Sequence, residues 1–139
     1  MSKETENKEV KKILVVEDDV FLSDIYCTKL QETDFEVDLA ITGEECLQKI
    51  KEKKYDLMIL DIVLPKIDGW EILAKIQEMK QKGGVENGNV ENLKIIILSN
   101  LGQKEEIQKG LRLGASSFMI KAHFTPSQIL EEVIKTVNQ

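Results

Sequence analysis

The chain has 139 residues, of which 42% are hydrophobic and 32% are charged, with 8 glycines and 2 prolines. This composition is typical of one folded domain with one core, and it excludes the fibrous, collagen-like and disordered classes. The 25 acidic residues outnumber the 19 basic ones, and the resulting formal net charge of −6 argues against binding DNA or an anionic membrane through a general electrostatic field. A cation or a basic partner fits this charge better.

Residues 1–11 are charged and aperiodic, so we expect a flexible N-terminal tail before a single domain over residues 12–139. Neither this tail nor any later segment has an apolar run long enough for a signal peptide or a membrane span. Cys27 and Cys46 are too few for a disulfide framework, which favours free, buried thiols in a reducing compartment. The sequence therefore predicts a cytoplasmic protein that does not contact a membrane.

After the tail, short apolar runs alternate with longer segments of helical periodicity. The runs cover residues 13–16, 37–40, 57–60, 95–98 and 118–120. Five strands alternating with five helices predict an α/β fold, in which a doubly wound (βα)5 chain forms a five-stranded parallel sheet with helices on both faces. Polar and apolar residues alternate in the second run, whereas the first, third and fourth are continuously apolar. This difference predicts that the second strand lies at an edge of the sheet.

The predicted helices carry signals at their first residues. Capping-box spacing is present in Thr42 with Glu45, Asp68 with Glu71, and Thr125 with Gln128. The helix predicted over 103–113 is the weakest, because it has few apolar positions and contains Gly110, which costs about 1 kcal/mol relative to alanine. Low local stability would suit an element that moves. Residues 82–92 are rich in glycine and asparagine without periodicity, which predicts a loop.

Polar side chains follow the apolar runs at the points where the predicted strands end. They are Glu17, Asp18 and Asp19 after the first run, Asp61 after the third, Ser99 after the fourth and Lys121 after the fifth. Because the carboxyl ends of parallel strands lie along one edge of a sheet, we expect these side chains to converge. Carboxylates that close together repel one another unless a cation neutralises them. With no histidine or thiolate among these residues, the all-oxygen donor set favours Mg²⁺ over Ca²⁺ or a softer metal.

A metal held by carboxylates beside a lysine is suited to binding phosphoryl oxygens. Phosphoryl transfer is catalysed mainly by positioning and by charge neutralisation, which Mg²⁺, Lys121 and the Ser99 hydroxyl could together supply. Asp61 is then the natural nucleophile and would form an aspartyl phosphate.

Four stretches of the sequence also resemble a known family: VVEDD at 15–19, LMILDIVLPKIDGW at 57–70, IIILSN at 95–100 and GASSFMIKA at 114–122. They are similar, in the same order, to the motifs of the receiver domain of two-component response regulators, including stand-alone chemotaxis regulators. The similarity extends from Lys12 to the end of the chain. It implies a flavodoxin-like sheet with the strand order 2-1-3-4-5.

The resemblance implies roles for the residues at matching positions. Asp61 would be the phosphorylated aspartate, and Asp18 would coordinate Mg²⁺ directly, with Glu17 acting mainly through water. Val63 would lend its backbone carbonyl to the metal. Lys121 would contact the phosphate.

The resemblance also implies two kinds of protein partner, one that donates the phosphoryl group and one that responds to the phosphorylated domain. A histidine kinase or a histidine phosphotransfer protein would supply the phosphoryl group. Ser99 would then move toward the phosphate and Phe118 would turn inward, repacking the face made by the fourth helix, the fifth strand and the fifth helix for a downstream target protein. The domain would assist its own phosphorylation and dephosphorylation without being an enzyme for another substrate, and it would not contact nucleic acid directly.

Two residues depart from the family pattern. Ala122 stands where the family usually has a proline after a cis bond, and a cis bond before a residue other than proline costs about 3–4 kcal/mol. Asn100 is larger than the alanine or glycine that usually follows the switch hydroxyl. A larger side chain there predicts a narrower path to Asp61 and a changed phosphoryl lifetime.

Two other classes that share parts of this pattern do not fit. A flavodoxin-like FMN carrier needs a phosphate loop rich in glycine, serine and threonine after the first strand, where this chain has Glu17, Asp18 and Asp19. A phosphatase of the haloacid-dehalogenase type expects a second aspartate two positions after Asp61, where this chain has Val63.

Some plainer interpretations stay open. The domain could be an interaction module that works without phosphorylation, or a receiver excised from a longer protein, although the first methionine and the last helix favour a stand-alone regulator. Asp18 or Asp19 taken alone would most simply be a helix cap. Trp70 is most simply a packing aromatic.

Overall fold

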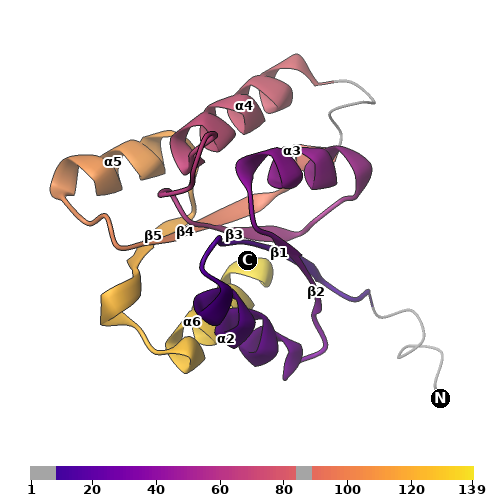
Figure 1. Ribbon diagram of the computed structural model, residues 1–139. Coiled ribbons are helices and arrows are strands. Elements are labelled where there is room, and N and C mark those ends of the chain that lie inside the picture. Colours follow the sequence, from indigo (N-terminus) through magenta and orange to yellow (C-terminus); the bar gives the residue numbers. More distant parts are fainter. Residues whose placement is uncertain (1–8, 84–88) are drawn as a thin grey trace.

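The computed structural model describes residues 9–83 and 89–139, and within them five parallel strands form one sheet in the order β2-β1-β3-β4-β5 (Figure 1). The strands are β1 (Lys12–Val16), β2 (Glu36–Ala40), β3 (Leu57–Leu60), β4 (Lys94–Ser99) and β5 (Ser117–Ile120). The helices are α2 (Val20–Gln31), α3 (Gly43–Glu52), α4 (Gly69–Lys82), α5 (Lys104–Arg112), the short 3-10 turn η2 (Lys121–His123) and α6 (Pro126–Val137). The predicted α/β fold, its strand order and the edge position of the second strand are therefore confirmed.

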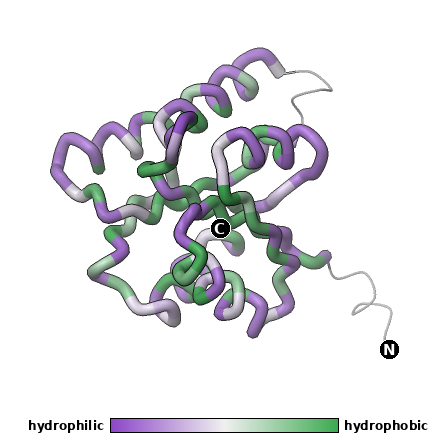
Figure 2. The backbone as a smooth tube through the Cα atoms, in the orientation of Figure 1, coloured by the Kyte–Doolittle hydropathy of each residue, from purple (hydrophilic) through white to green (hydrophobic). Residues whose placement is uncertain are grey.

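The helices lie on both faces of the sheet, with α3, α4 and α5 on one side and α2 and α6 on the other (Figure 1). Alternate residues of the central strands point to opposite faces, so that Leu14 and Val16 pack toward one helix layer while Ile13 and Val15 pack toward the other. Burial on both faces explains the continuous apolar runs in these strands. Hydrophobic residues accordingly concentrate in the central strands, and hydrophilic ones on the outer helices (Figure 2).

The three predicted N-cap residues all cap their helices, but only one of the three predicted boxes is complete, because at α4, as at α3, only the side chain of the cap residue takes part. The box at α6 is complete: the Gln128 N–H donates to Thr125 Oγ1 at 3.2 Å, and the Thr125 N–H donates to Gln128 Oε1 at 2.8 Å. At α3 the Glu45 N–H donates to Thr42 Oγ1 at 3.1 Å, but the Glu45 carboxylate accepts from the Ile41 N–H, one residue before the cap. The α3 box is therefore only half formed.

Helix α5 packs closer to the sheet than its sequence suggests. Gly110 is its one buried residue, and a Cβ atom there would lie 2.6 Å from Ile97 Cδ1 and 3.0 Å from Phe118 Cδ2. The glycine is thus the residue that allows close packing. The first turn of α5 is also capped in a way that the sequence did not predict, since the Gln103 N–H donates to Glu106 Oε1 at 3.0 Å.

Most of the predicted tail and part of the predicted loop are not described. Residues 1–8 of the tail and 84–88 of the loop lie outside the described residues. Among the helices of the described ranges, none combines the length and the apolar character needed to cross a membrane.

Candidate functional site

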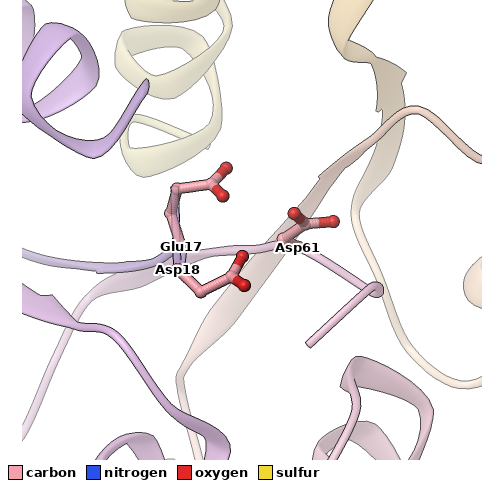
Figure 3. Close-up of side chains that lie close together, drawn as sticks. All are labelled: Glu17, Asp18 and Asp61. Atoms are coloured by element: carbon pink, nitrogen blue, oxygen red, sulfur yellow. The ribbon is translucent and has the colours of Figure 1, made fainter. Parts of the chain in front are cut away.

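Three carboxylates meet at the carboxyl ends of β1 and β3, which are neighbours in the sheet. Glu17 and Asp18 follow β1, and Asp61 follows β3, where its N–H donates to the carbonyl of Val16 at 3.1 Å. One carboxylate oxygen from each of Glu17, Asp18 and Asp61 lies within 4.8 Å of the other two (Figure 3). Glu17 is 2% exposed and Asp61 is 5% exposed, whereas Asp18 faces solvent.

The ammonium group of Lys121 joins the two buried carboxylates. Its Nζ lies 2.6 Å from Glu17 Oε1 and 2.7 Å from Asp61 Oδ2. Lys121 comes directly after β5, so three strand ends contribute to one polar cluster, as the sequence predicts. We call Glu17, Asp18, Asp61 and Lys121 the acidic cluster.

Backbone amides orient the second oxygen of each buried carboxylate. The Asp19 N–H donates to Glu17 Oε2 at 3.1 Å, and the Val63 N–H donates to Asp61 Oδ1 at 3.1 Å. Each of these carboxylates therefore has one oxygen on the ammonium and one on an amide, which is how a buried negative charge is held in place. Asp18 makes no hydrogen bond or ion pair within the described part of the chain.

Two buried carboxylates share a single ammonium, and this imbalance shows in the pKa of Glu17. Burial raises the pKa of Glu17, and the negative charge of Asp61 adds to the rise, while Lys121 and the Asp19 amide only partly offset it. Burial alone would lower the pKa of Lys121, but its hydrogen bonds to Asp61 and Glu17 outweigh that effect and raise it. The ammonium therefore stays charged, and the cluster keeps an excess of negative charge that a further cation would relieve.

The donor set fits Mg²⁺. All the candidate ligand atoms are carboxylate oxygens, which hard cations prefer, and the exposed Asp18 leaves room for the water molecules that Mg²⁺ retains. Asp18 has no competing partner within the described residues and is the side chain best placed to coordinate the ion directly. Glu17 and Asp61 each keep lone pairs beyond those that accept from Lys121 and the amides.

The remaining candidate residues lie near the acidic cluster but outside its hydrogen bonds. Ser99 ends β4, between the strands that carry Asp61 and Lys121; it is fully buried, and its Oγ accepts a long 3.4 Å hydrogen bond from the Leu101 N–H. Phe118 in β5 is partly buried and packs against the core on the α5 side of the sheet. Ser99 and Phe118 therefore belong to neighbouring strands of the sheet, and Phe118 lies next to α5.

Asp19 borders the acidic cluster, but its role in the fold is to cap a helix. The Asp19 Oδ1 accepts the Leu22 N–H at 3.1 Å, so Asp19 is the N-cap of α2 and lies outside the group of candidate metal ligands. The peptide bond between Lys121 and Ala122 is trans, because the described residues contain no cis bond.

Tyr26 belongs to the surroundings of the cluster although no sequence motif includes it. It is 6% exposed and lines, together with Lys121 and Asn100, a shallow groove of about 360 Å³. Burial raises the pKa of its phenol, with Lys121 lowering it and Glu17 raising it in turn. The helical spacing of Leu22, Tyr26 and Leu30 places Tyr26 on the buried face of α2. Only its phenol hydroxyl distinguishes Tyr26 from an ordinary core residue.

The segment after Asp61 is a tight loop that is closed by Gly69. The Gly69 N–H donates to the carbonyl of Ile62 at 2.9 Å, and a Cβ atom at Gly69 would lie 2.7 Å from the Asp61 carbonyl oxygen. Asp68 caps α4 by accepting the Glu71 N–H at 3.0 Å. The end of β3 and the start of α4 are therefore joined as one rigid unit.

The sequence pattern of the response regulator receiver domain matches residues 13–134. The chain belongs to this family. Receiver domains act between histidine kinases and downstream effectors in two-component systems, and they are phosphorylated on an aspartate beside an acidic pocket that binds Mg²⁺. The chain is therefore a signalling domain and not an enzyme in the usual sense.

Known receiver proteins resemble the chain in sequence and in structure. It is 34% identical over 115 residues to the phosphate regulon transcriptional regulatory protein PhoB of Rhizobium meliloti (strain 1021), which is 83% of this chain and 47% of that protein. The chain spans about half the length of the curated relatives it matches. A CheY-like receiver domain protein from Methanospirillum hungatei JF-1 superposes with a TM-score of 0.80 at 27% identity, covering 94% of this chain and 95% of that one.

A second solved structure was determined as a complex. The CheX-CheY-BeF3-Mg²⁺ complex from Borrelia burgdorferi superposes on this receiver domain with a TM-score of 0.77 at 28% identity. The match covers 90% of this chain and 87% of that one.

Proposed function

We propose that this receiver domain accepts a phosphoryl group on Asp61, with Mg²⁺ bound at Asp18 and Asp61, and that the modification changes a surface used to bind a target protein. The observation that supports this most directly is the contact of one ammonium with Glu17 and Asp61, while Asp18 lies within 4.8 Å and faces solvent. A cation site and a fixed ammonium on either side of one carboxylate suit an incoming phosphoryl group.

The donor is proposed to be a phosphohistidine of a histidine kinase or a histidine phosphotransfer protein. A carboxylate oxygen of Asp61 attacks phosphorus, the O–P bond forms as the N–P bond breaks, and the imidazole leaves with the electron pair. Lys121 then exchanges its contact with Asp61 for one with a phosphoryl oxygen, which keeps the negative charge paired. When bound, Mg²⁺ supplies further neutralisation, held by Asp18, Asp61, the Val63 carbonyl and, through water, Glu17.

The response is proposed to pass through Ser99 and Phe118. The buried Ser99 Oγ at present accepts a long 3.4 Å hydrogen bond from the Leu101 N–H, and a phosphoryl oxygen on Asp61 would be a strong acceptor for the Ser99 O–H. Movement of Ser99 would vacate space beside Phe118, whose ring packs between the sheet and α5. The face formed by α5, β5 and α6 would then change shape for a downstream target protein, without direct contact with nucleic acid.

Removal of the phosphoryl group is proposed to occur at the same site. Water attacks phosphorus, the O–P bond breaks and the Asp61 carboxylate is regenerated. Asn100 lines the groove next to Lys121 and is placed to hinder that water, so we expect its truncation to alanine to shorten the lifetime of the phosphoryl group.

The proposal is tested by incubating the protein with Mg²⁺ and acetyl phosphate and measuring its intact mass. We expect one added phosphoryl group in wild type, released by hydroxylamine as an acyl phosphate is, and none in Asp61→Asn. The matched control is Asp34→Asn, which removes the same charge from an exposed position outside the cluster. Equal labelling of wild type and Asp61→Asn would refute the assignment, and an unlabelled wild type would favour an interaction module that works without phosphorylation.

A further inference from the structure

Two side-chain contacts attach α5 to α4. The Nζ of Lys109 on α5 lies 4.3 Å from the centroid of the Trp70 ring on α4, in the geometry of a cation–π contact. Farther along, Gln77 Nε2 on α4 donates to the carbonyl of Leu113 at the end of α5 at 2.5 Å. The first contact lies close to the acidic cluster, because Trp70 follows Gly69 directly.

The backbone of Trp70 is attached to the loop that follows Asp61, the proposed phosphoacceptor. Gly69, the residue before it, is hydrogen-bonded to Ile62 and has no space for even a methyl group against Ile62 and the Asp61 carbonyl. The backbone of Trp70 is therefore anchored next to the loop that follows Asp61, and a motion of α5 relative to α4 would change the distance from Lys109 to the Trp70 ring.

The position of the Phe118 ring is coupled to the position of α5. Lys109 precedes Gly110, the one buried residue of α5, and a Cβ atom at Gly110 would lie 3.0 Å from Cδ2 and 3.4 Å from Cε2 of the Phe118 ring. Because the helix covers the ring this closely, the ring cannot turn unless α5 shifts. Few other contacts hold α5 in place, since Leu111 is 46% exposed and Ile107 is only partly buried.

We propose that the contact between Lys109 and Trp70 is an inhibitory latch, which holds α5 over Phe118 in the resting position and opens when Asp61 is phosphorylated. This inference rests on the proposed function, and it names the contact that sets how strongly the switch resists activation. A cation–π contact at an exposed site changes the equilibrium constant between two states by roughly two- to fivefold. Loss of the latch should raise the switched-to-resting ratio by that factor.

The latch gives a direct optical readout, because Trp70 is the only tryptophan in the chain. We expect saturating beryllofluoride with Mg²⁺ to change the tryptophan emission of wild type as the cation leaves the ring. Binding of beryllofluoride is measured separately by fluorine NMR of the bound ion. Bound beryllofluoride with an unchanged tryptophan emission spectrum would overturn the latch and leave the proposed function standing. Absence of bound beryllofluoride would overturn both the latch and the proposed function.

The charge of Lys109 is tested by substitution. Lys109→Met keeps the apolar part of the lysine side chain and removes its charge. It should lower the beryllofluoride concentration at half saturation by roughly two- to fivefold. It should also shift the Ser99 and Ile120 amide resonances of the unmodified protein toward their beryllofluoride positions. Lys109→Arg should restore wild-type values, and Lys104→Met, on the same helix at an exposed position, should leave them unchanged.

A second variant separates the latch from a general loss of structure. Trp70→Leu removes the other partner and should give the same shift as Lys109→Met, while the double variant should add nothing further. Equal half-saturation in Lys109→Met and wild type, or additive effects of the two substitutions, would overturn the latch.

Discussion

At the scale of single residues, the two buried carboxylates and Asp18 differ in how fully they are bonded. Glu17 and Asp61 each accept from Lys121 and from a backbone amide, whereas Asp18 accepts from nothing in the described residues. Asp18 is therefore the carboxylate that can bind a cation without first giving up a protein partner.

Replacing Asp18 should weaken the binding of Mg²⁺ more than replacing its neighbour. We expect Asp18→Asn to lose about tenfold or more in Mg²⁺ affinity, because a direct ligand is removed from a small set. Asp19→Asn is the matched control, since Asp19 caps α2 and is not part of the carboxylate group. Calorimetric titration measures both, and equal losses in the two variants would contradict the assignment of Asp18.

Removal of the ammonium should destabilise the fold in a way that Mg²⁺ partly repairs. Lys121→Met leaves Glu17 and Asp61 buried without their shared cation, and breaking a buried ion pair from one side costs about 3–5 kcal/mol. Mg²⁺ should recover part of the loss by supplying charge at the same oxygens. Urea unfolding with and without Mg²⁺ gives both values; a loss as small as that of the exposed Lys104→Met would contradict the role of Lys121.

The convergence of these side chains could be predicted, but their detailed bonding could not. Parallel strands end at one edge, so the positions of Glu17, Asp61 and Lys121 in the sequence suffice to bring them together. The amides of Asp19 and Val63 depend on loop backbone angles that no side-chain pattern encodes. The proximity of Tyr26 could not be predicted for a different reason, because on a helix a buried tyrosine has the same spacing as a leucine.

At the scale of elements, Gly110 of α5 is unfavourable for helix propensity in the sequence but allows close packing in the structure. Glycine inside a helix costs about 1 kcal/mol by propensity, and the sequence therefore predicts that α5 is weak. The structure adds that Gly110 brings α5 into contact with Ile97 and Phe118, which only a tertiary neighbour can reveal. The half-formed α3 box has a different, local origin, since the Glu45 carboxylate accepts from the Ile41 N–H instead of the Thr42 N–H.

Adding a methyl group to Gly110 should destabilise the protein despite improving the helix. Gly110→Ala gains about 1 kcal/mol in propensity, but its Cβ would fall 2.6 Å from a methyl of the fully buried Ile97, and overpacking costs about 1–3 kcal/mol. We expect a net loss of about 1 kcal/mol in urea unfolding. Gln108→Ala, exposed on the same helix, is the control, and a more stable Gly110→Ala would show that α5 has room to move away.

At the scale of the whole molecule, a second charged cluster stabilises the edge strand β2, far from the strand ends that carry the site. Lys53 pairs with Glu36 and lies 2.8 Å from Asp38 Oδ2, which also accepts the Tyr55 hydroxyl at 2.6 Å. Burial alone would raise the pKa of Asp38, but the hydrogen bonds from Lys53 and Tyr55 outweigh it and lower the pKa below its ordinary value of 3.8. Charge on an edge strand also discourages pairing with another sheet.

This depressed pKa predicts how stability depends on pH. A carboxyl group that is more acidic in the folded state stabilises the fold above its unfolded pKa, and the contribution is lost as the pH falls from 3.8 through the folded value. Asp38→Asn should therefore be less stable than wild type at pH 7, with the difference shrinking at pH 3. Urea unfolding at the two pH values measures this, and a difference that stays constant would contradict the prediction.

The acidic cluster joins residues that are far apart along the chain: Glu17 and Lys121 are separated by 104 positions, and Asp61 lies between them. A ribosome making this protein finishes the first three strands long before it adds the ammonium. The nascent polypeptide therefore carries the Asp61 carboxylate without the Lys121 counter-charge while the next 60 residues are added. On the proposed function, competence to accept a phosphoryl group would arise only when β5 docks, so that an incomplete or misfolded copy would stay silent.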